Sequence, residues 1–231
     1  MRGVLRLSVV VPTFNEKSNV WELLSRTETT LGHEGWEMIF VDDDSPDGTA
    51  SVVRDIARVN PRVRILQRIG RRGLSSACIE GMLATSAPVI AVIDADLQHD
   101  ETRLPVMLDA IESGRADIVV ATRYAEGGSA GEWNQTLAQM SRIAAVLSRT
   151  VLQHPVSDPM SGFFMLTRTI LDETVRGLSG LGFKILLDIL ATSRGRSGSL
   201  RFRIPFANDS PERASWTAWP SGTSACCWQT N

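Results

Sequence analysis

Residues 89–100, VIAVIDADLQHD, end an apolar run with two carboxylates one residue apart, Asp94 and Asp96. Because side chains alternate along a strand, we expect Asp94, Asp96 and Gln98 to project to one side of the chain. Two carboxylates that close repel one another unless a positive charge lies between them. Mg²⁺ and Mn²⁺ prefer oxygen ligands and usually share their shell with a substrate diphosphate. The pattern predicts a metal site built from these three residues. A solvated strand-end turn is the alternative, because aspartate is common in turns.

Further polar residues follow other apolar runs. Three consecutive aspartates, residues 42–44, cannot all bind one metal, but one could accept hydrogen bonds from a nucleoside base or ribose. Glu16 follows Pro12 and Thr13, and it could contact the nucleoside or serve only as a helix-start carboxylate. Arg123 could pair with a phosphate or form a surface ion pair.

The elements that must position these residues alternate along the chain. Apolar, β-branched runs predict strands, and apolar residues at helical spacing predict the helices between them. Such an α/β order predicts a mainly parallel sheet covered by helices on both faces, with ligands beyond the carboxyl ends of the strands. Predicted strands cover residues 7–14, 37–44, 63–69, 87–96, 116–124 and 200–206, with a short strand within 154–168; predicted helices include 17–31, 74–86, 132–152 and 182–193.

Composition excludes several classes of protein. With 231 residues and 43% hydrophobic content, the chain can form one well-buried globular domain. A net charge of −2 gives no basic field for nucleic acid. The three cysteines show neither metal nor redox spacing, which favours a reducing compartment, and His99 and His154 are isolated and receive no role. No G-x-G-x-x-G follows the first strand, which argues against a dehydrogenase.

The motifs taken together resemble the GT-A-fold glycosyltransferases of family 2. The polyprenyl-phosphate (dolichyl-phosphate) mannose synthase group is the most similar. The resemblance spans about residues 7–206 and rests on VVVPTFNE, VDDDSPDGT, GRRGLSSACIEGM, DADLQHD, ATRYAEGG, SDPMSGFFML, GFKILLDIL and IPF. It implies a GT-A nucleotide-diphospho-sugar transferase fold. It also implies transfer of a sugar, mannose from GDP-mannose above all, to a polyprenyl or dolichyl phosphate with inversion.

The resemblance also implies roles for individual residues. Asp94, Asp96 and Gln98 would bind Mg²⁺ or Mn²⁺, and Asp96 and Arg123 would be catalytic, Arg123 through the donor or acceptor phosphates. The remaining nucleotide-sugar contacts would come from a larger set: Pro12, Thr13, Glu16, Asp43, Asp94, Ser161, Gly162 and Lys184. The acceptor phosphate is already an anionic nucleophile, so positioning and electrostatics would suffice without a strong general base.

Two other functions stay open. The chain could be an undecaprenyl-phosphate glucosyl or aminosugar transferase or a polysaccharide synthase, because few contacts determine the choice of a UDP-sugar or GDP-mannose. It could also be a truncated product that binds nucleotide without catalysis.

Membrane contact is expected at the protein surface. The N-terminal apolar run reaches Pro12 and Glu16 too early for a signal peptide, and no stretch approaches the ~20 apolar residues of a membrane span. We therefore expect a cytoplasmic protein, peripheral at the cytosolic face of the membrane. The apolar residues 163–165 are candidates for the lipid contact, although at least one of the two phenylalanines there is expected in the core.

The composition changes after Phe206. Residues 207–231 hold three of the six tryptophans and two of the three cysteines, without helical or alternating periodicity. Permissible codons for residues 210–218, read in the frame that starts at the third base of the Ser210 codon, encode Ala-Gly-Glu-Ser-Lys-Leu-Asp-Ser. This peptide contains the GESKLD that normally follows IPF in the group. We therefore expect a transferase domain at 1–206 and an aberrant, disordered tail at 207–231 produced by a frameshift, or alternatively a divergent natural terminus.

Overall fold

A computed structural model describes residues 4–121, 160–193, 201–203 and 217–218. Its strands are β1 (Leu7–Thr13), β2 (Trp36–Asp42), β3 (Val63–Gln67), β4 (Val89–Val92), β5 (Ile118–Val120), β6 (Phe164–Thr167), β7 (Arg201–Arg203) and β8 (Thr217–Ala218). Its helices are α1 (Val20–Leu31), α2 (Thr49–Val59), α3 (Leu74–Leu83), α4 (Leu104–Glu112), α6 (Arg168–Thr174) and α7 (Ile185–Ser193), with 3₁₀ turns at Glu101–Arg103 and Val175–Gly177.

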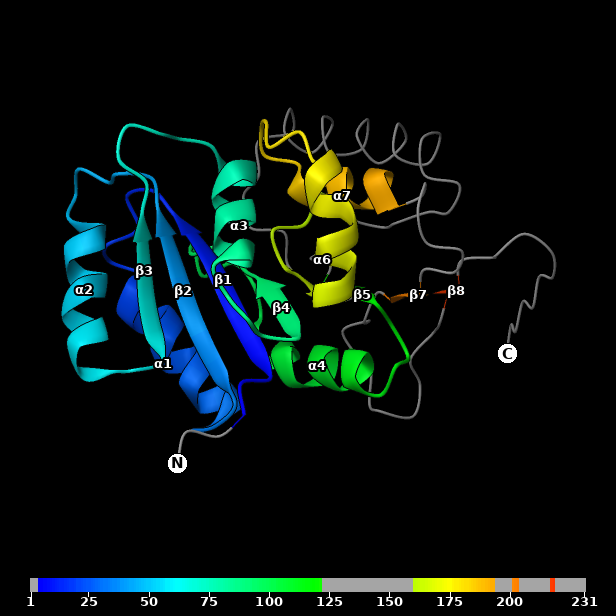
Figure 1. The fold of residues 1–231 in the computed structure, drawn as a ribbon. Coiled ribbons are helices and arrows are strands. Elements are labelled where there is room, and N and C mark those ends of the chain that lie inside the picture. The colour runs from blue at the N-terminus through cyan, green and yellow to red at the C-terminus, as the bar shows by residue number, and fades with distance from the viewer. Residues whose placement is uncertain (1–3, 122–159, 194–200, 204–216, 219–231) are drawn as a thin grey trace.

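The described strands form one sheet in the order β3-β2-β1-β4-β6-β5-β7-β8. Strands β1 to β4 are parallel, and β5 pairs parallel with β7. Strand β6 lies antiparallel between β4 and β5, and β8 is antiparallel to β7. The predicted α/β class with a mainly parallel sheet is confirmed (Figure 1).

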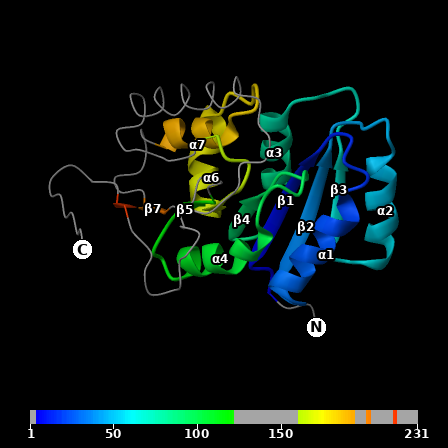
Figure 2. The same ribbon diagram turned by 180° about the vertical axis from the view of Figure 1, so that it is seen from behind.

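Helices cover both faces of this sheet, as the continuous apolar strands predict. Alternation along β1 sends Val9 and Val11 into one cluster and Val10 into the other. Helices α3, α6 and α7 pack on the face in front in Figure 1, and α1, α2 and α4 pack on the opposite face, seen in Figure 2. Helix α3 comes very close to the sheet at Gly81, where an added Cβ would lie 2.4 Å from a methyl carbon of Val10.

Two details of the predicted elements are wrong. Strand β4 ends at Val92 rather than at residue 96, so Asp94 and Asp96 follow the strand in a turn. Phe163, Phe164 and Met165, considered for lipid contact, are all buried because β6 is an interior strand whose side chains fill both cores.

Within the described residues, no helix combines the length and the apolar character needed to cross a membrane.

Candidate functional site

The polar segments that follow β1, β2 and β4 meet at one edge of the sheet. Because these strands are parallel and β1 pairs with both β2 and β4, their carboxyl ends lie side by side. Thr13 at the end of β1 is paired in register with Asp42 at the end of β2. The carboxylates of Asp94 and Asp96 lie near enough to Glu16 to raise the pKa of its side chain. The structure therefore brings together acidic residues separated by about 80 positions in the chain.

A turn presents the carboxylates of the DADLQHD segment. Leu97, the residue between Asp96 and Gln98, has a φ of 60°, in the left-handed region that non-glycine residues rarely adopt. The backbone N–H of Gln98 donates to Asp96 Oδ1 at 3.1 Å, which closes the turn. Strand alternation is therefore the wrong reason for grouping Asp94, Asp96 and Gln98, because a turn positions them.

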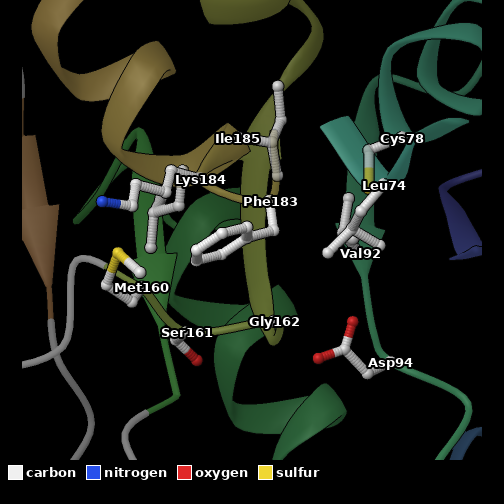
Figure 3. Close-up of a pocket in the computed structure, with 11 residues that line it drawn as sticks. Leu74, Cys78, Val92, Asp94, Met160, Ser161, Gly162, Phe183, Lys184 and Ile185 are labelled. Carbon is white, nitrogen blue, oxygen red and sulfur yellow. The ribbon is translucent and has the colours of Figure 1, made fainter. Parts of the chain in front are cut away.

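Asp94 lies in a narrow space between two segments. The backbone of Gly162 lies so close that an added Cβ would be 1.7 Å from Asp94 Oδ2. On another side, His99 Nε2 lies 3.5 Å from the same oxygen. Asp94 also lines a pocket with apolar residues of α3 and β4 and with the segments around Ser161 and Lys184 (Figure 3). Glycine at position 162 is thus a steric requirement for the observed position of Asp94.

Negative charge accumulates at this edge. Partial burial raises the pKa of Glu16, and the nearby carboxylates of Asp96, Asp47 and Asp94 raise it further, while a hydrogen bond from Asn19 opposes the shift. Within the described residues, no three His, Cys, Asp or Glu side chains form a complete metal-binding group. The carboxylates of Asp94 and Asp96 supply oxygen atoms, the kind of ligand that Mg²⁺ and Mn²⁺ prefer.

The second acidic cluster serves the structure first. Asp43 is buried and accepts hydrogen bonds from Arg68 Nη1 and from the Gly73 backbone N–H, both at 2.7 Å. Asp42 is buried and accepts from Thr13 Oγ1 at 3.2 Å and from the Ser45 hydroxyl at 2.6 Å. These bonds anchor the loops that form the rim of the site. A nucleoside contact by Asp43 stays a prediction.

Arg68 is a buried residue of this region that the sequence motifs do not predict. This arginine is only 2% exposed, and besides Asp43 it donates to the Gly73 carbonyl at 3.1 Å and to the Ser76 hydroxyl at 2.6 Å. It therefore ties the end of β3 and the start of α3 to the end of β2. The sequence indicates this arginine only weakly, because the one clue is that it follows β3 while three aspartates lie at the end of the neighbouring β2.

The other predicted site residues differ in their surroundings. Pro12 is buried within β1. Ser161 is buried, and its hydroxyl donates to the Ala121 carbonyl at 2.7 Å, so it fixes the backbone that leads to Gly162. Lys184 is exposed and lines the same pocket as Ser161 and Gly162 (Figure 3). Arg123 lies outside the described residues.

The chain is similar to known proteins over most of its length. Residues 8–175 match the family described as Glycosyl transferase family 2. A dolichol-phosphate mannosyltransferase of Pyrococcus furiosus is 37% identical over 80% of this chain and 52% of its own length. A dolichol-phosphate mannosyltransferase of Saccharomyces cerevisiae is 35% identical over 81% of this chain and 70% of its own. The chain thus spans about half the length of the P. furiosus relative.

A solved structure shares the fold. Glucosyl-3-phosphoglycerate synthase from Mycobacterium tuberculosis, crystallised with Mn²⁺, UDP and glucosyl-3-phosphoglycerate, superposes with a TM-score of 0.61 at 19% identity. The superposition covers 80% of this chain and 64% of the synthase. At this identity, the similarity confirms the predicted GT-A fold.

Proposed function

Because this chain belongs to glycosyl transferase family 2, we propose that it transfers a sugar from a nucleotide diphosphate to the phosphate of a polyprenyl or dolichyl lipid, with inversion. Mannose from GDP-mannose is the proposed donor, supported by relatives named dolichol-phosphate mannosyltransferase at 34–37% identity. The structural observation that carries the proposal is the acidic edge of the sheet, where Asp94 and Asp96 follow β4 in a turn that the Gln98 N–H closes on Asp96.

The proposed cofactor is Mg²⁺ or Mn²⁺, held by Asp94, Asp96 and Gln98. The carboxylates of Asp94 and Asp96, in the turn after β4, supply the oxygen ligands that a hard divalent ion prefers. The Mn²⁺ in the crystals of the M. tuberculosis synthase is consistent with this assignment. When bound, the ion neutralises charge on the leaving diphosphate.

The chain's own residues would act mainly by binding and orienting. A lipid-phosphate oxygen attacks the anomeric carbon, and the bond to the nucleotide diphosphate breaks on the opposite side, its electron pair leaving with the diphosphate. The exposed ammonium group of Lys184 is suited to attract a phosphate to the pocket that it shares with Asp94. Arg123 is proposed for the same task. Arg68 and Asp43 would keep the nucleoside rim in place.

A UDP-sugar donor is the second candidate. The synthase with the same fold was crystallised with UDP and with UDP-glucose. The third candidate is a chain that binds nucleotide without transfer, because the proposed frameshift after Phe206 would remove the lysine and serine of the GESKLD motif. Sequencing the gene beyond the codon for Phe206 tests the frameshift. A clean open frame without an alternative-frame Gly-Glu-Ser-Lys would refute it.

Transfer assays test the proposed reaction. GDP-mannose, UDP-glucose and UDP-N-acetylglucosamine are each offered with polyprenyl phosphate to the 231-residue chain and to a chain with the frame restored after residue 206. We expect mannosyl transfer to the lipid phosphate by the restored chain and little or none by the 231-residue chain. Transfer by the restored chain to free monosaccharides but not to lipid phosphate would contradict the proposal.

We further propose where the protein meets the membrane. Residues 178–184, here called the 178–184 loop, lead from the 3₁₀ turn after α6 to α7. In this loop the side chains of Leu181 and Phe183 are 79% and 60% exposed, next to the exposed Lys184. The loop lies against α3 through a hydrogen bond from the Ser75 N–H to the Gly182 carbonyl. Apolar side chains beside a cation, at the rim of the pocket, suit an anionic lipid surface.

Vesicle binding tests this location. Leu181→Ser combined with Phe183→Ser removes the apolar contact, and we expect about tenfold weaker partitioning onto phosphatidylglycerol vesicles, which corresponds to about 1.4 kcal/mol. The control is Val59→Ser on α2, where an equally exposed valine is removed. Equal partitioning of the wild-type protein and the double variant in sedimentation would contradict the proposed contact.

A further inference from the structure

His99 is a buried side chain without a hydrogen-bond partner at its Nε2 atom. The side chain is 2% exposed, and Nε2 makes no hydrogen bond in the described structure. The ring packs edge-on against Phe163, with 5.6 Å between centroids. Buried polar atoms are nearly always hydrogen-bonded, so an exception asks for an explanation.

The nearest acidic group to Nε2 is the carboxylate of Asp94. Nε2 lies 3.5 Å from Asp94 Oδ2, slightly beyond a good hydrogen bond. The Phe163 ring packs against the imidazole but has no hydrogen-bonding group to offer Nε2. Asp94 is more exposed, at 28%, and faces the pocket. A small rotation of Asp94 would therefore complete the hydrogen bond without moving the buried ring.

Gly162 limits the movement of Asp94 from another side. Its backbone leaves no room for a Cβ beside Oδ2, so Oδ2 is confined between Gly162 and His99. Figure 3 shows Asp94 directed toward the segment that carries Ser161 and Gly162. Asp94 Oδ2 thus lies between the Gly162 backbone and the His99 ring, while the Asp94 side chain also lines the pocket.

We propose that His99 is a positioning residue: it donates its Nε2–H to Asp94 Oδ2 and thereby orients the carboxylate toward the divalent cation. The proposal rests on the metal site of the proposed function. Carboxylates that bind metals are themselves held by hydrogen bonds, and loss of such a partner typically lowers metal affinity 10- to 100-fold. His99 would supply this support from the same DADLQHD segment that carries the ligands.

The proposal is tested by the Mn²⁺ affinity of the 231-residue chain in the presence of GDP. This affinity is measured by calorimetry or from the electron paramagnetic resonance signal of free Mn²⁺. His99→Phe keeps a flat ring against Phe163 but removes the donor, and we expect about tenfold weaker Mn²⁺ binding. His99→Gln places an amide N–H near the Nε2 position, and we expect affinity within about threefold of wild type. His33→Phe, at an exposed histidine, is the matched control.

The outcomes separate this proposal from the proposed metal site. If wild type binds Mn²⁺ and His99→Phe binds it equally well, or if His99→Gln is as weak as His99→Phe, the assignment of His99 is overturned. If wild type and Asp94→Asn are equally poor at binding Mn²⁺, the metal site itself is overturned. Thermal unfolding of each variant identifies any loss that comes from misfolding, and a His99→Phe variant that is fully folded yet weak in Mn²⁺ binding supports the proposal.

Discussion

Gly162→Ala is expected to weaken Mn²⁺-dependent nucleotide binding about 100-fold, at the upper end of the effects that follow a change around a metal ligand. The added methyl group would lie 1.7 Å from Asp94 Oδ2 and 2.7 Å from Oδ1, so the carboxylate has to leave its position. The affinity of the variant for GDP and UDP in the presence of Mn²⁺, measured by calorimetry, checks this expectation.

Gly177→Ala is the matched control for Gly162→Ala. Its added methyl group would meet the end of the Thr192 side chain at 2.7 Å, away from the acidic edge. We expect both alanine variants to stay folded, because the added methyl groups meet the ends of the Asp94 and Thr192 side chains, which can rotate away. Only Gly162→Ala should lose nucleotide affinity. Wild-type affinity in a folded Gly162→Ala variant would show that the position of Asp94 does not matter for binding.

Arg68→Leu is expected to lower the free energy of unfolding by about 3–5 kcal/mol, because it leaves the carboxylate of Asp43 buried without its charged partner. The substitution also removes the hydrogen bonds that Arg68 donates to the Gly73 carbonyl and the Ser76 hydroxyl. Urea unfolding curves measure the change. Asp43→Asn in the Arg68→Leu background should recover part of the loss, since a neutral amide costs less to bury than an unpaired charge.

Arg71→Leu provides the comparison for Arg68→Leu. Arg71 makes two hydrogen bonds to Glu80, but its side chain is 61% exposed, so the expected loss is below about 1 kcal/mol. Equal losses for Arg68→Leu and Arg71→Leu would contradict the central structural role of the buried arginine.

The fold could be predicted largely from local patterns. Continuous apolar runs indicated β1 and β2, because strands covered by helices on both faces of a sheet are apolar throughout. Apolar residues at helical spacing indicated α1, because one face of the helix packs on the sheet. The insertion of β6 between β4 and β5 was not predictable in this way. It depends on pairing between strands about 75 residues apart along the chain, which leaves no local signal.

The candidate site was predicted in composition but not in geometry. Asp94, Asp96 and Gln98 were identified, yet the position of Gln98 relative to Asp96 depends on the left-handed backbone of Leu97, a conformation that leucine rarely adopts. Arg68 and His99 were missed because an arginine or a lone histidine after a strand is usually at the surface. Only the three-dimensional structure shows that both side chains are buried close to the acidic residues.

Calorimetric titration of GDP and UDP into the 231-residue chain, with Mn²⁺ and then with EDTA, tests the metal-dependent nucleotide site most directly. Nucleotide binding is measured because it does not require the acceptor contacts that the proposed frameshift would remove. We predict nucleotide binding that requires Mn²⁺, is abolished by EDTA and is strongly weakened in Asp96→Ala. Tight binding that is unchanged by EDTA and by Asp96→Ala would contradict the account.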